Sequence, residues 1–319
     1  MNDESNYPQN NFHIPVLVDQ VCQALFYKPK DSVNIFDGTL GGGGYTSKFI
    51  DYATSQKIKI NQFSSDLDST AIDRVLSYIS VPENQNLEIR QGNFAEVITS
   101  FEDNFFDGIT LDLGFSSNQL EESGRGFAYL NREEPLDLRY DVVNGHSASY
   151  LLHKLHKWQQ LGKIIYEYSG EDLALRIAKK VYETNKKTPW TVGDFVDIVV
   201  SVIPITAMKR KNQILSRVWQ SLRIWVNAEF ESLELFLPIA LNKLKIGGRL
   251  AIVSFHSLED KIITKYLREK CKPIKEDEYG NKEFQFSLIT HKGVSPDDQE
   301  IQRNPRSRSA VLRVIEKLC

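Results

Sequence analysis

Short apolar runs alternate with amphipathic stretches along the first third of the chain. Four runs that read as buried strands lie at residues 33–38, 60–66, 87–94 and 106–114. Between them, residues 44–54 and 69–79 carry apolar side chains at helical spacing, and Ser69 is the expected N-cap of the second stretch. Strands and helices in alternation predict βαβ units and therefore an α/β fold on a parallel sheet.

The pattern changes after this region. Residues 115–145 are polar and rich in glycine and charge, which predicts a long ordered loop, and residues 147–203 show helical spacing without a convincing strand. A long helix is expected from about Ser216, because apolar side chains recur at steps of three and four. These side chains are Val218, Leu222, Val226, Phe230, Leu233 and Leu237.

The last part of the chain returns to the α/β pattern. Residues 247–255 read as a buried strand and residues 258–271 as a helix, while residues 283–291 and 309–317 alternate like an antiparallel pair that closes the sheet. We therefore predict a discontinuous domain interrupted by an inserted loop and small helical domain. The predicted bounds are residues 12–115 and 216–319 for the discontinuous domain, and 116–215 for the insertion.

Acidic and glycine residues follow several of the expected strands. Right-handed crossovers put the carboxyl ends of parallel strands at one edge of the sheet, where ligands of such sheets bind. The residues expected at this edge are Gly41–Gly44, Asp66, Phe94 and Asp112. The sequence therefore predicts a ligand site there.

The stretch FDGTLGGGGYT (36–46) restricts the ligand. A dinucleotide fingerprint needs a third glycine where this chain has Thr46, and a phosphate loop needs a Gly-Lys-Ser/Thr end that is missing here. Two acidic strand ends, Asp37 and Asp66, fit S-adenosylmethionine instead, since carboxylates suit its ammonium and its ribose hydroxyls. The alternative is a plain strand-to-helix turn in which glycine supplies positive φ.

Composition narrows the classes of protein. The 319 residues include 41% hydrophobic and 25% charged residues, as in a globular protein with a full core, and the formal net charge is −3. Three scattered cysteines without a CxxC pair and six histidines without metal spacing favour neither a disulfide framework nor a metal site. The polar N-terminus does not resemble a signal peptide, and no apolar run is long enough to span a bilayer. We expect a cytoplasmic protein without a membrane partner.

A net negative charge means that any affinity for nucleic acid must rest on local basic clusters. Two clusters stand out, one with Lys209, Arg210, Lys211 and Arg217, the other with Arg303, Arg306 and Arg308. The alternative is a pair of solvated basic loops.

Several longer motifs occur in order along the chain. They include LDLGFSSNQL (111–120), GRGFAYLNREEPLDLRYD (124–141), SRVWQSLRIWVNAE (216–229), SFHSLED (254–260) and NPRSRS (304–309). From about His13 to Lys317 the chain resembles the RsmH (MraW) family of 16S ribosomal RNA cytosine-N4 methyltransferases. The resemblance implies a Rossmann-like class I methyltransferase sheet with an inserted helical domain, and S-adenosyl-L-methionine as the cofactor. It also implies a cytidine in the decoding region of 16S rRNA, within the small ribosomal subunit, as the substrate.

The resemblance implies a set of cofactor contacts. These are Gly43, Gly44, Tyr45, Asp66, Phe94, Asp112 and Gln119. The family usually has Arg and His where this chain has Gly42 and Tyr45, and Asp-Gly where it has Glu133-Glu134. Tyr45 is nevertheless expected to stack or to donate a hydrogen bond.

Methylation of cytosine N4 needs an acceptor for an amine proton, because the lone pair of this amine is delocalised into the ring. Our candidates for the reacting base are Asp112, Asp137 and His256. The alternative for Asp112 is a role in cofactor binding alone, and the alternative for His256 is a structural role. Glu259 and Asp260 are expected to charge the first turn of the next helix.

Substrate-binding candidates lie in the inserted region and near the C-terminal end. In an extended segment Asp137, Arg139 and Asp141 share one face, and Arg139 is expected on a phosphate unless the three form an internal ion pair. On the long helix, Arg223 and Asn227 form a polar row with Gln220 that is assigned to RNA rather than to a solvated face. The remaining candidates for RNA contacts are Arg306 and Arg308.

Three competing functions stay open on the residues alone. A DNA or other RNA amino-methyltransferase shares the chemistry, although Asp112 is followed by LGF rather than by a Pro-Pro-aromatic motif. A nicotinamide dehydrogenase lacks its third glycine, and a non-catalytic RNA-binding assembly protein has no need for acidic strand ends. The number of methyl groups and the oligomeric state, including a homodimer, are left open.

Overall fold

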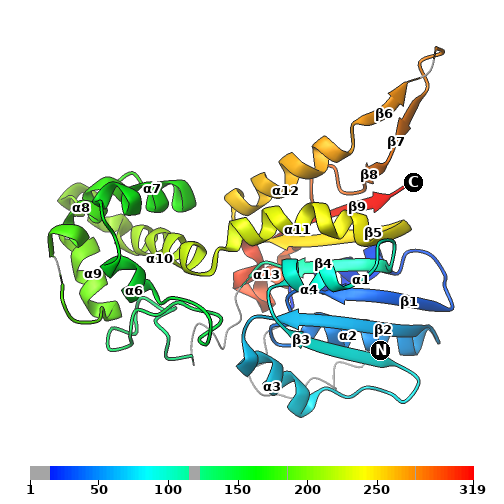
Figure 1. Cartoon of the computed structure of the whole chain (residues 1–319), viewed down its shortest axis with the longest axis horizontal. Coiled ribbons are helices and arrows are strands. Elements are labelled where there is room, and N and C mark those ends of the chain that lie inside the picture. Colours follow the sequence, from blue (N-terminus) through cyan, green and yellow to red (C-terminus); the bar gives the residue numbers. More distant parts are fainter. Residues whose placement is uncertain (1–14, 115–122, 185, 277) are drawn as a thin grey trace. The chain divides into compact units, whose positions relative to one another are not determined.

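The computed structural model describes residues 15–114, 123–184, 186–276 and 278–319. The chain forms two compact units (Figure 1). The first comprises Met1–Phe115 with Ser232–Cys319, and the second comprises Ser116–Glu231.

The first unit is built on a mixed sheet, whose order is β3-β2-β1-β4-β5-β9-β8. Its strands are β1 (Ser32–Asp37), β2 (Lys59–Asp66), β3 (Asn86–Gln91), β4 (Phe106–Asp112), β5 (Leu244–Ser254), β8 (Phe286–Leu288) and β9 (Val311–Lys317). The pairs among β1 to β5 are parallel, and β9 is antiparallel to both β5 and β8. The four predicted strands at the start of the chain and the antiparallel closure are confirmed.

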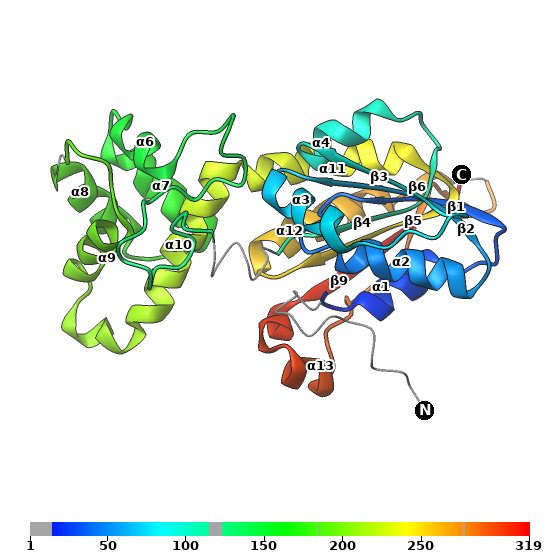
Figure 2. The same ribbon diagram turned by 90° about the horizontal axis from the view of Figure 1, so that it is seen from below.

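Helices cover both faces of this sheet. They are α1 (Val18–Leu25), α2 (Gly44–Ser55), α3 (Ser69–Tyr78), α4 (Phe94–Val97), α11 (Glu229–Lys243), α12 (Ser257–Lys270) and α13 (Asp298–Arg303), with short 3₁₀ turns η1 (Ile98–Ser100) and η3 (Pro305–Ser309). Figure 2 shows α1 and α2 on the face opposite α11.

The core of this unit follows the two-residue period of the strands. On β1, Ile35 packs toward α1 and α2, and Phe36 packs toward α11. Phe36, Phe106 and Phe236 are fully buried, and burial of one such ring contributes about 3 kcal/mol. The sheet is therefore a rigid platform for the loops at its edge.

Two local predictions for this unit are wrong. The N-cap of α3 is Asp68, whose side chain accepts from the Thr70 backbone N–H, so Ser69 is already the first helical residue. The predicted strand over 283–291 is divided, because β7 (Lys282–Phe284) pairs with β6 (Pro273–Glu276) in a separate exposed hairpin. An alternating apolar pattern is the same in one strand as in two consecutive strands, so it could not reveal the division.

The second unit is helical. It contains α6 (Ala148–His153), α7 (Trp158–Ser169), α8 (Ala174–Thr184), α9 (Val192–Ser201), η2 (Ile205–Arg210) and α10 (Lys211–Asn227). Residues 123–147 form ordered turns before α6, as the composition of this stretch indicates. The Trp219 indole N–H of α10 donates to the Gly126 carbonyl at 2.9 Å, which fastens these turns to the helices.

The long helix predicted from Ser216 is also wrong. It is two helices, because Ala228 lies between α10 and α11 with left-handed backbone angles (φ 48°, ψ 44°). The apolar spacing continues through this residue, so the pattern could not reveal the break. Residues 216–231, predicted as part of the first domain, group with the second unit, because α10 buries Val218, Trp219 and Leu222 in the second unit's core.

Within the described residues, no helix is long and apolar enough to cross a membrane. The same residues contain no group of three or more His, Cys, Asp and Glu side chains that could hold a metal ion.

Candidate active site

The strand order reverses between β1 and β4, whose neighbours continue in opposite directions along the sheet. Open parallel sheets bind ligands at such a switch point, outside the carboxyl ends of the strands. Asp37 is the last residue of β1 and Asp112 the last residue of β4. The topology thus brings two predicted acidic strand ends to the same place.

The glycine turn between β1 and α2 is held by backbone bonds and close packing. Gly43 has φ 71°, and its N–H donates to the Leu40 carbonyl at 2.6 Å. A Cβ at Gly43 would approach Val75 and the Tyr78 hydroxyl to 3.0 Å, and one at Gly44 would approach Pro15 to 2.8 Å. Both the positive φ and the tight protein contacts therefore require glycine in this turn.

Asp66 joins the end of β2 to the same turn. Its Oδ2 accepts from the Gly41 N–H at 2.7 Å, and its Oδ1 accepts from the Asp68 N–H at 2.9 Å. Removal from water raises the pKa of Asp66 to about 6, against these backbone donors, which lower it. The Leu67 backbone N–H is a third donor to this carboxylate. Three donors leave at least one of its four lone pairs open, so the carboxylate can also accept from a ligand.

Asp37 is fully buried, and each of its oxygens has a protein donor. Its Oδ1 accepts from the Thr39 N–H at 3.1 Å and its Oδ2 from the Thr46 hydroxyl at 2.8 Å. Burial raises the pKa of Asp37 to about 6. The Thr39 hydroxyl accepts in turn from the Asp112 N–H at 2.7 Å. Thr39 and Thr46 fix both strand ends, and sequence reasoning missed them because hydroxyl residues around a glycine turn are common.

Asp112 differs from Asp37 because it is buried but incompletely bonded. No described residue donates a hydrogen bond to its Oδ1. Burial, followed by the negative charge of Asp37, raises the pKa of Asp112 to about 8. An open carboxylate oxygen in such a place fits a cationic or N–H-bearing ligand group, since an unsatisfied buried acceptor costs free energy.

The side chain of Tyr45 is buried and bonded within the protein. The side chain is 3% exposed, its ring packs near Phe49, and its hydroxyl donates to the Val16 carbonyl. Burial raises the pKa of Tyr45 well above its ordinary value, so the phenol stays protonated. These contacts make Tyr45 a core residue, and they leave its predicted hydrogen bond to cofactor without a donor.

We expect Tyr45→Phe to lower the free energy of unfolding by about 1–2 kcal/mol, because the buried Val16 carbonyl loses its donor. The affinity for S-adenosylhomocysteine should stay within twofold of the wild-type value. Urea titration and calorimetry measure the two quantities, and Tyr52→Phe is a matched change on the same helix. A tenfold loss of affinity would instead show a direct contact with the cofactor.

Two further predicted cofactor residues have different outcomes. Phe94 opens α4 directly after β3 and packs edge-on against Phe236, with 5.1 Å between ring centroids. It thus lies near the predicted edge while supporting α11. Gln119 lies outside the described residues.

His256 follows β5 and is the N-cap of α12. Its Nδ1 accepts from the Glu259 backbone N–H at 3.3 Å, and its Nε2 lies 2.9 Å from Glu259 Oε1. Glu259 completes a capping box, and Asp260 is bound by Arg313 with bonds of 2.8 and 2.9 Å. The expected first-turn role of both acids is confirmed. The contacts of His256 show a structural role, and its catalytic role stays a prediction.

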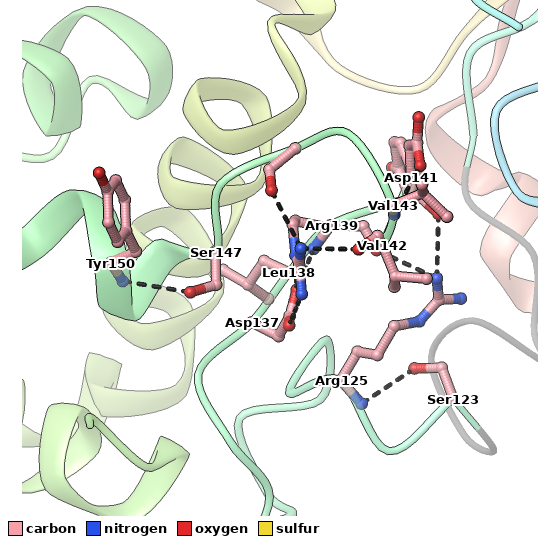
Figure 3. A network of polar contacts seen from close by, with 12 residues as sticks. Ser123, Arg125, Asp137, Leu138, Arg139, Asp141, Val142, Val143, Ser147 and Tyr150 are labelled. Carbon is pink, nitrogen blue, oxygen red and sulfur yellow. Dashed lines mark hydrogen bonds and ion pairs between the residues drawn. The ribbon is translucent and has the colours of Figure 1, made fainter.

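Asp137 lies in the second unit. Both of its oxygens accept from Arg139, with Nε 2.8 Å from Oδ1 and Nη2 2.7 Å from Oδ2 (Figure 3). Arg139 also donates to the carbonyls of Val142 and Gly145. The segment is not extended, because Leu138 has φ 64° and turns the chain between the two residues, so the condition for a shared face is not met.

Asp141 closes the adjacent turn by accepting from the backbone N–H groups of Val143 and Asn144. These donors help to lower its pKa. The internal ion pair thus joins Asp137 to Arg139, and Asp141 orders a turn. The catalytic role of Asp137 and the phosphate contact of Arg139 stay predictions, with contacts that favour loop order.

The polar row on α10 is also bonded internally. Arg223 is 8% exposed and forms two bonds with Glu229, of 2.8 and 2.9 Å. Asn227 bridges the Tyr140 N–H and the Leu138 carbonyl, and Gln220 donates to the Tyr168 carbonyl. These side chains hold the turns and helices of their own unit together, and their contact with RNA stays a prediction.

Arg306 and Arg308 lie in η3 and are exposed. Val311, which follows this turn, pairs with Ser254 at the carboxyl end of β5. The antiparallel direction of β9 therefore places the arginine turn at the same edge of the sheet as Asp112.

Comparison with known proteins identifies the family. The model of the MraW methylase family matches residues 10–318. The chain belongs to this family. A ribosomal RNA small subunit methyltransferase H from Thermotoga neapolitana is 35% identical over 309 residues, which cover 96% of either chain. The enzyme of that name from Anaplasma marginale is 33% identical, with 96% of this chain and 99% of that one covered.

Family membership makes the chain a methyltransferase that depends on S-adenosylmethionine. The residues at the switch point fit this cofactor, because Asp112 leaves a buried oxygen open among the described residues and Asp66 keeps capacity to accept one further bond. Among solved structures, an rRNA methylase from Streptococcus thermophilus aligns with a TM-score of 0.37 and 12% identity, covering 95% of this chain and 94% of that one. An alignment this loose adds no weight to the assignment.

Proposed function

We propose that this methyltransferase transfers a methyl group to N4 of a cytidine in the decoding region of 16S rRNA. The observation that carries the chemistry is the open Asp112 Oδ1 at the switch point. The curated relatives are named small-subunit rRNA methyltransferases, which supports the substrate. Such a substrate implies that the protein works in the cytoplasm. Action as a homodimer is a further proposal, for which the described residues supply no contact between protomers.

When bound, S-adenosylmethionine supplies an electrophilic methyl group on a positively charged sulfur. The chain must hold the amine in line with that methyl and accept the proton that N4 loses as the new N–C bond forms. Asp112 is the proposed acceptor. With a pKa of about 8 the carboxyl is mostly protonated near neutral pH, and a cation bound beside it favours the ionised form. Binding of the positive cofactor thus prepares the acceptor.

The other site residues have supporting roles in this proposal. Asp37 orients Thr39 and Thr46. Its negative charge also opposes ionisation of Asp112, so Asp112 keeps its proton until a cation binds. Asp66 accepts from the ribose hydroxyls and at the same time fixes the glycine turn through the Gly41 N–H. His256 acts by fixing the start of α12.

Radiolabelled methyl transfer to small subunits, free rRNA and DNA tests the proposal. Nucleoside analysis should yield N4-methylcytidine from the small subunits. Label in DNA alone, or at a carbon or ring nitrogen, would contradict it. The number of labelled methyl groups per cytidine at completion also reports whether one or two methyl groups are added.

Changing both Arg306 and Arg308 to Gln should raise the KM for small subunits and flatten its dependence on salt. Each lost phosphate contact reduces the slope of log K against log salt by about 1. Kinetics between low and moderate salt measure this slope. The matched control changes Lys57 and Lys59, which are exposed at the start of β2 and thus at the opposite edge of the sheet. Equal slopes for both double variants would remove η3 from the RNA interface.

A further inference from the structure

A stretch of the second unit combines basic and aromatic side chains without any acid. Residues 142–166 contain no Asp or Glu, although the chain as a whole has 42 of them. The same stretch holds three of the six histidines and three lysines. The members around α6, which we call the α6 surface, are His146, Tyr150, His153, Lys154, His156 and Lys157. All six side chains belong to exposed residues.

The centre of this surface is a ladder of stacked groups. The rings of His146 and Tyr150 are stacked, with 4.3 Å between centroids and 20° between planes. Lys154 Nζ lies 5.4 Å from the Tyr150 ring centroid. Tyr150 lies on α6, His146 directly precedes the N-cap Ser147 and Lys154 is the C-cap, so the three side chains follow one another at steps of four residues.

Contacts within the second unit fix the backbone that carries this ladder. Ser147 caps α6 by accepting from the Tyr150 backbone N–H at 3.1 Å (Figure 3). Ala148 and Leu152 are buried in the core of the unit, and the Ser149 hydroxyl accepts from the Trp190 N–H at 2.9 Å. Tyr150 is 42% exposed on a fixed backbone, so its ring needs little ordering to bind a flat partner.

We propose that the α6 surface binds a single-stranded segment of the RNA substrate, with a base stacked on the His146–Tyr150 pair. Lys154 and Lys157 then lie close enough along the chain to pair with neighbouring phosphates. Every nucleobase offers a π-face to an aromatic platform, and the absence of acids across 25 residues of sequence suits a polyanion. The choice of RNA as the partner rests on the proposed function.

Substitutions of Tyr150 separate stacking from other contributions. Tyr150→Ala should weaken binding of a fluorescent single-stranded RNA, and raise the KM for small subunits, by about tenfold. Tyr150→Phe keeps the ring and should stay within twofold of the wild type. The matched control is Tyr166→Ala on α7, which removes a tyrosine that is 59% exposed. Turnover at saturating substrate and the affinity for S-adenosylhomocysteine should not change in any of these variants.

A second variant tests the phosphate contacts. Changing Lys154 and Lys157 to Gln should lower the slope of log K against log salt by about 1.5. If Tyr150→Ala and this double variant both keep the wild-type RNA affinity and KM, the inference is overturned and the methylation activity is unaffected. If the wild type binds RNA through Tyr150 but methylates no rRNA, the proposed function fails and the RNA-binding surface stands. Equal losses in Tyr150→Ala and Tyr166→Ala would also overturn it, because the effect would not be specific to the ladder.

Discussion

Replacing Asp112 by Asn should lower the single-turnover rate of methyl transfer by about 100-fold or more. The variant keeps the size of the side chain but cannot accept the proton that leaves N4. In the wild type, the rate at saturating substrate should rise with pH until the acceptor is fully ionised in the complex. Quench-flow measurements on small subunits, between pH 6 and 8, give both quantities.

Proton release provides a more direct readout of the same group. Calorimetry in buffers of different ionisation enthalpy should show that S-adenosylmethionine expels more protons than its neutral product, S-adenosylhomocysteine, because only the former carries a charged sulfur. Both ligands carry the same amine, so its contribution to proton release cancels in the comparison. The charged or titratable groups that act on Asp112 are Asp37 and Glu259. Asp112→Asn should abolish the difference, and equal proton release by both ligands in the wild type contradicts the proposal.

Stability measurements show whether Asp112→Asn folds. The pKa of this group is raised from 3.8 to about 8, so the unliganded fold holds the proton more tightly than the unfolded chain. Its contribution to stability is complete below pH 3.8 and is lost as the pH rises toward 8. At pH 7.5 the variant should therefore be more stable than the wild type, by on the order of 1–3 kcal/mol. Asp107→Asn is a control at the opposite end of β4, where the carboxylate is paired with Lys30 and Lys245.

Asp66→Ala should weaken the binding of S-adenosylmethionine and S-adenosylhomocysteine equally, by about 10- to 100-fold. A hydrogen bond to a charged acceptor contributes about 1.5–3 kcal/mol, and the ribose offers two hydroxyls. The equal loss follows because both ligands carry the same ribose. Isothermal titration measures both affinities.

Loss of the Gly41 bond is a second effect of the same substitution. A ligand without the ribose hydroxyls separates the two effects, since it should bind the wild type weakly and lose little further affinity in Asp66→Ala. Asp73→Ala removes an exposed carboxylate from the next helix and should change neither affinity. Undiminished binding of the cofactor by a folded Asp66→Ala chain would end the assignment.

The sequence predicts the sheet well because its central strands are apolar and buried, as β4 is along its whole length. Apolar runs such as those around Phe36 and around Ile109 leave little alternative to strands. Crossover handedness then places Asp37, Asp66 and Asp112 at one edge. The break at Ala228 could not be predicted, since alanine is a strong helix former and its left-handed backbone results from tertiary packing.

The partners of the site residues were less predictable than their positions. Arg139 and Arg223 match a basic RNA-facing pattern, yet each is bonded to a carboxylate two or six residues away. Tyr45 follows a glycine turn and still points into the core, because the hydroxyl finds the Val16 carbonyl there. Spacing along the chain shows which edge or face a residue belongs to, whereas the direction of a long side chain depends on the partner that the fold brings to it, near or far along the chain.

The position of β9 has a consequence for how the protein is made. This strand is synthesised after all the others, yet it lies between β5 and β8 inside the sheet. Until residues 311–317 leave the ribosome, β5 has an apolar, unpaired edge, which is the kind of surface that pairs with other chains. The nascent sheet is therefore exposed to aggregation until the end of translation, and a chain interrupted before residue 311 cannot bury that edge.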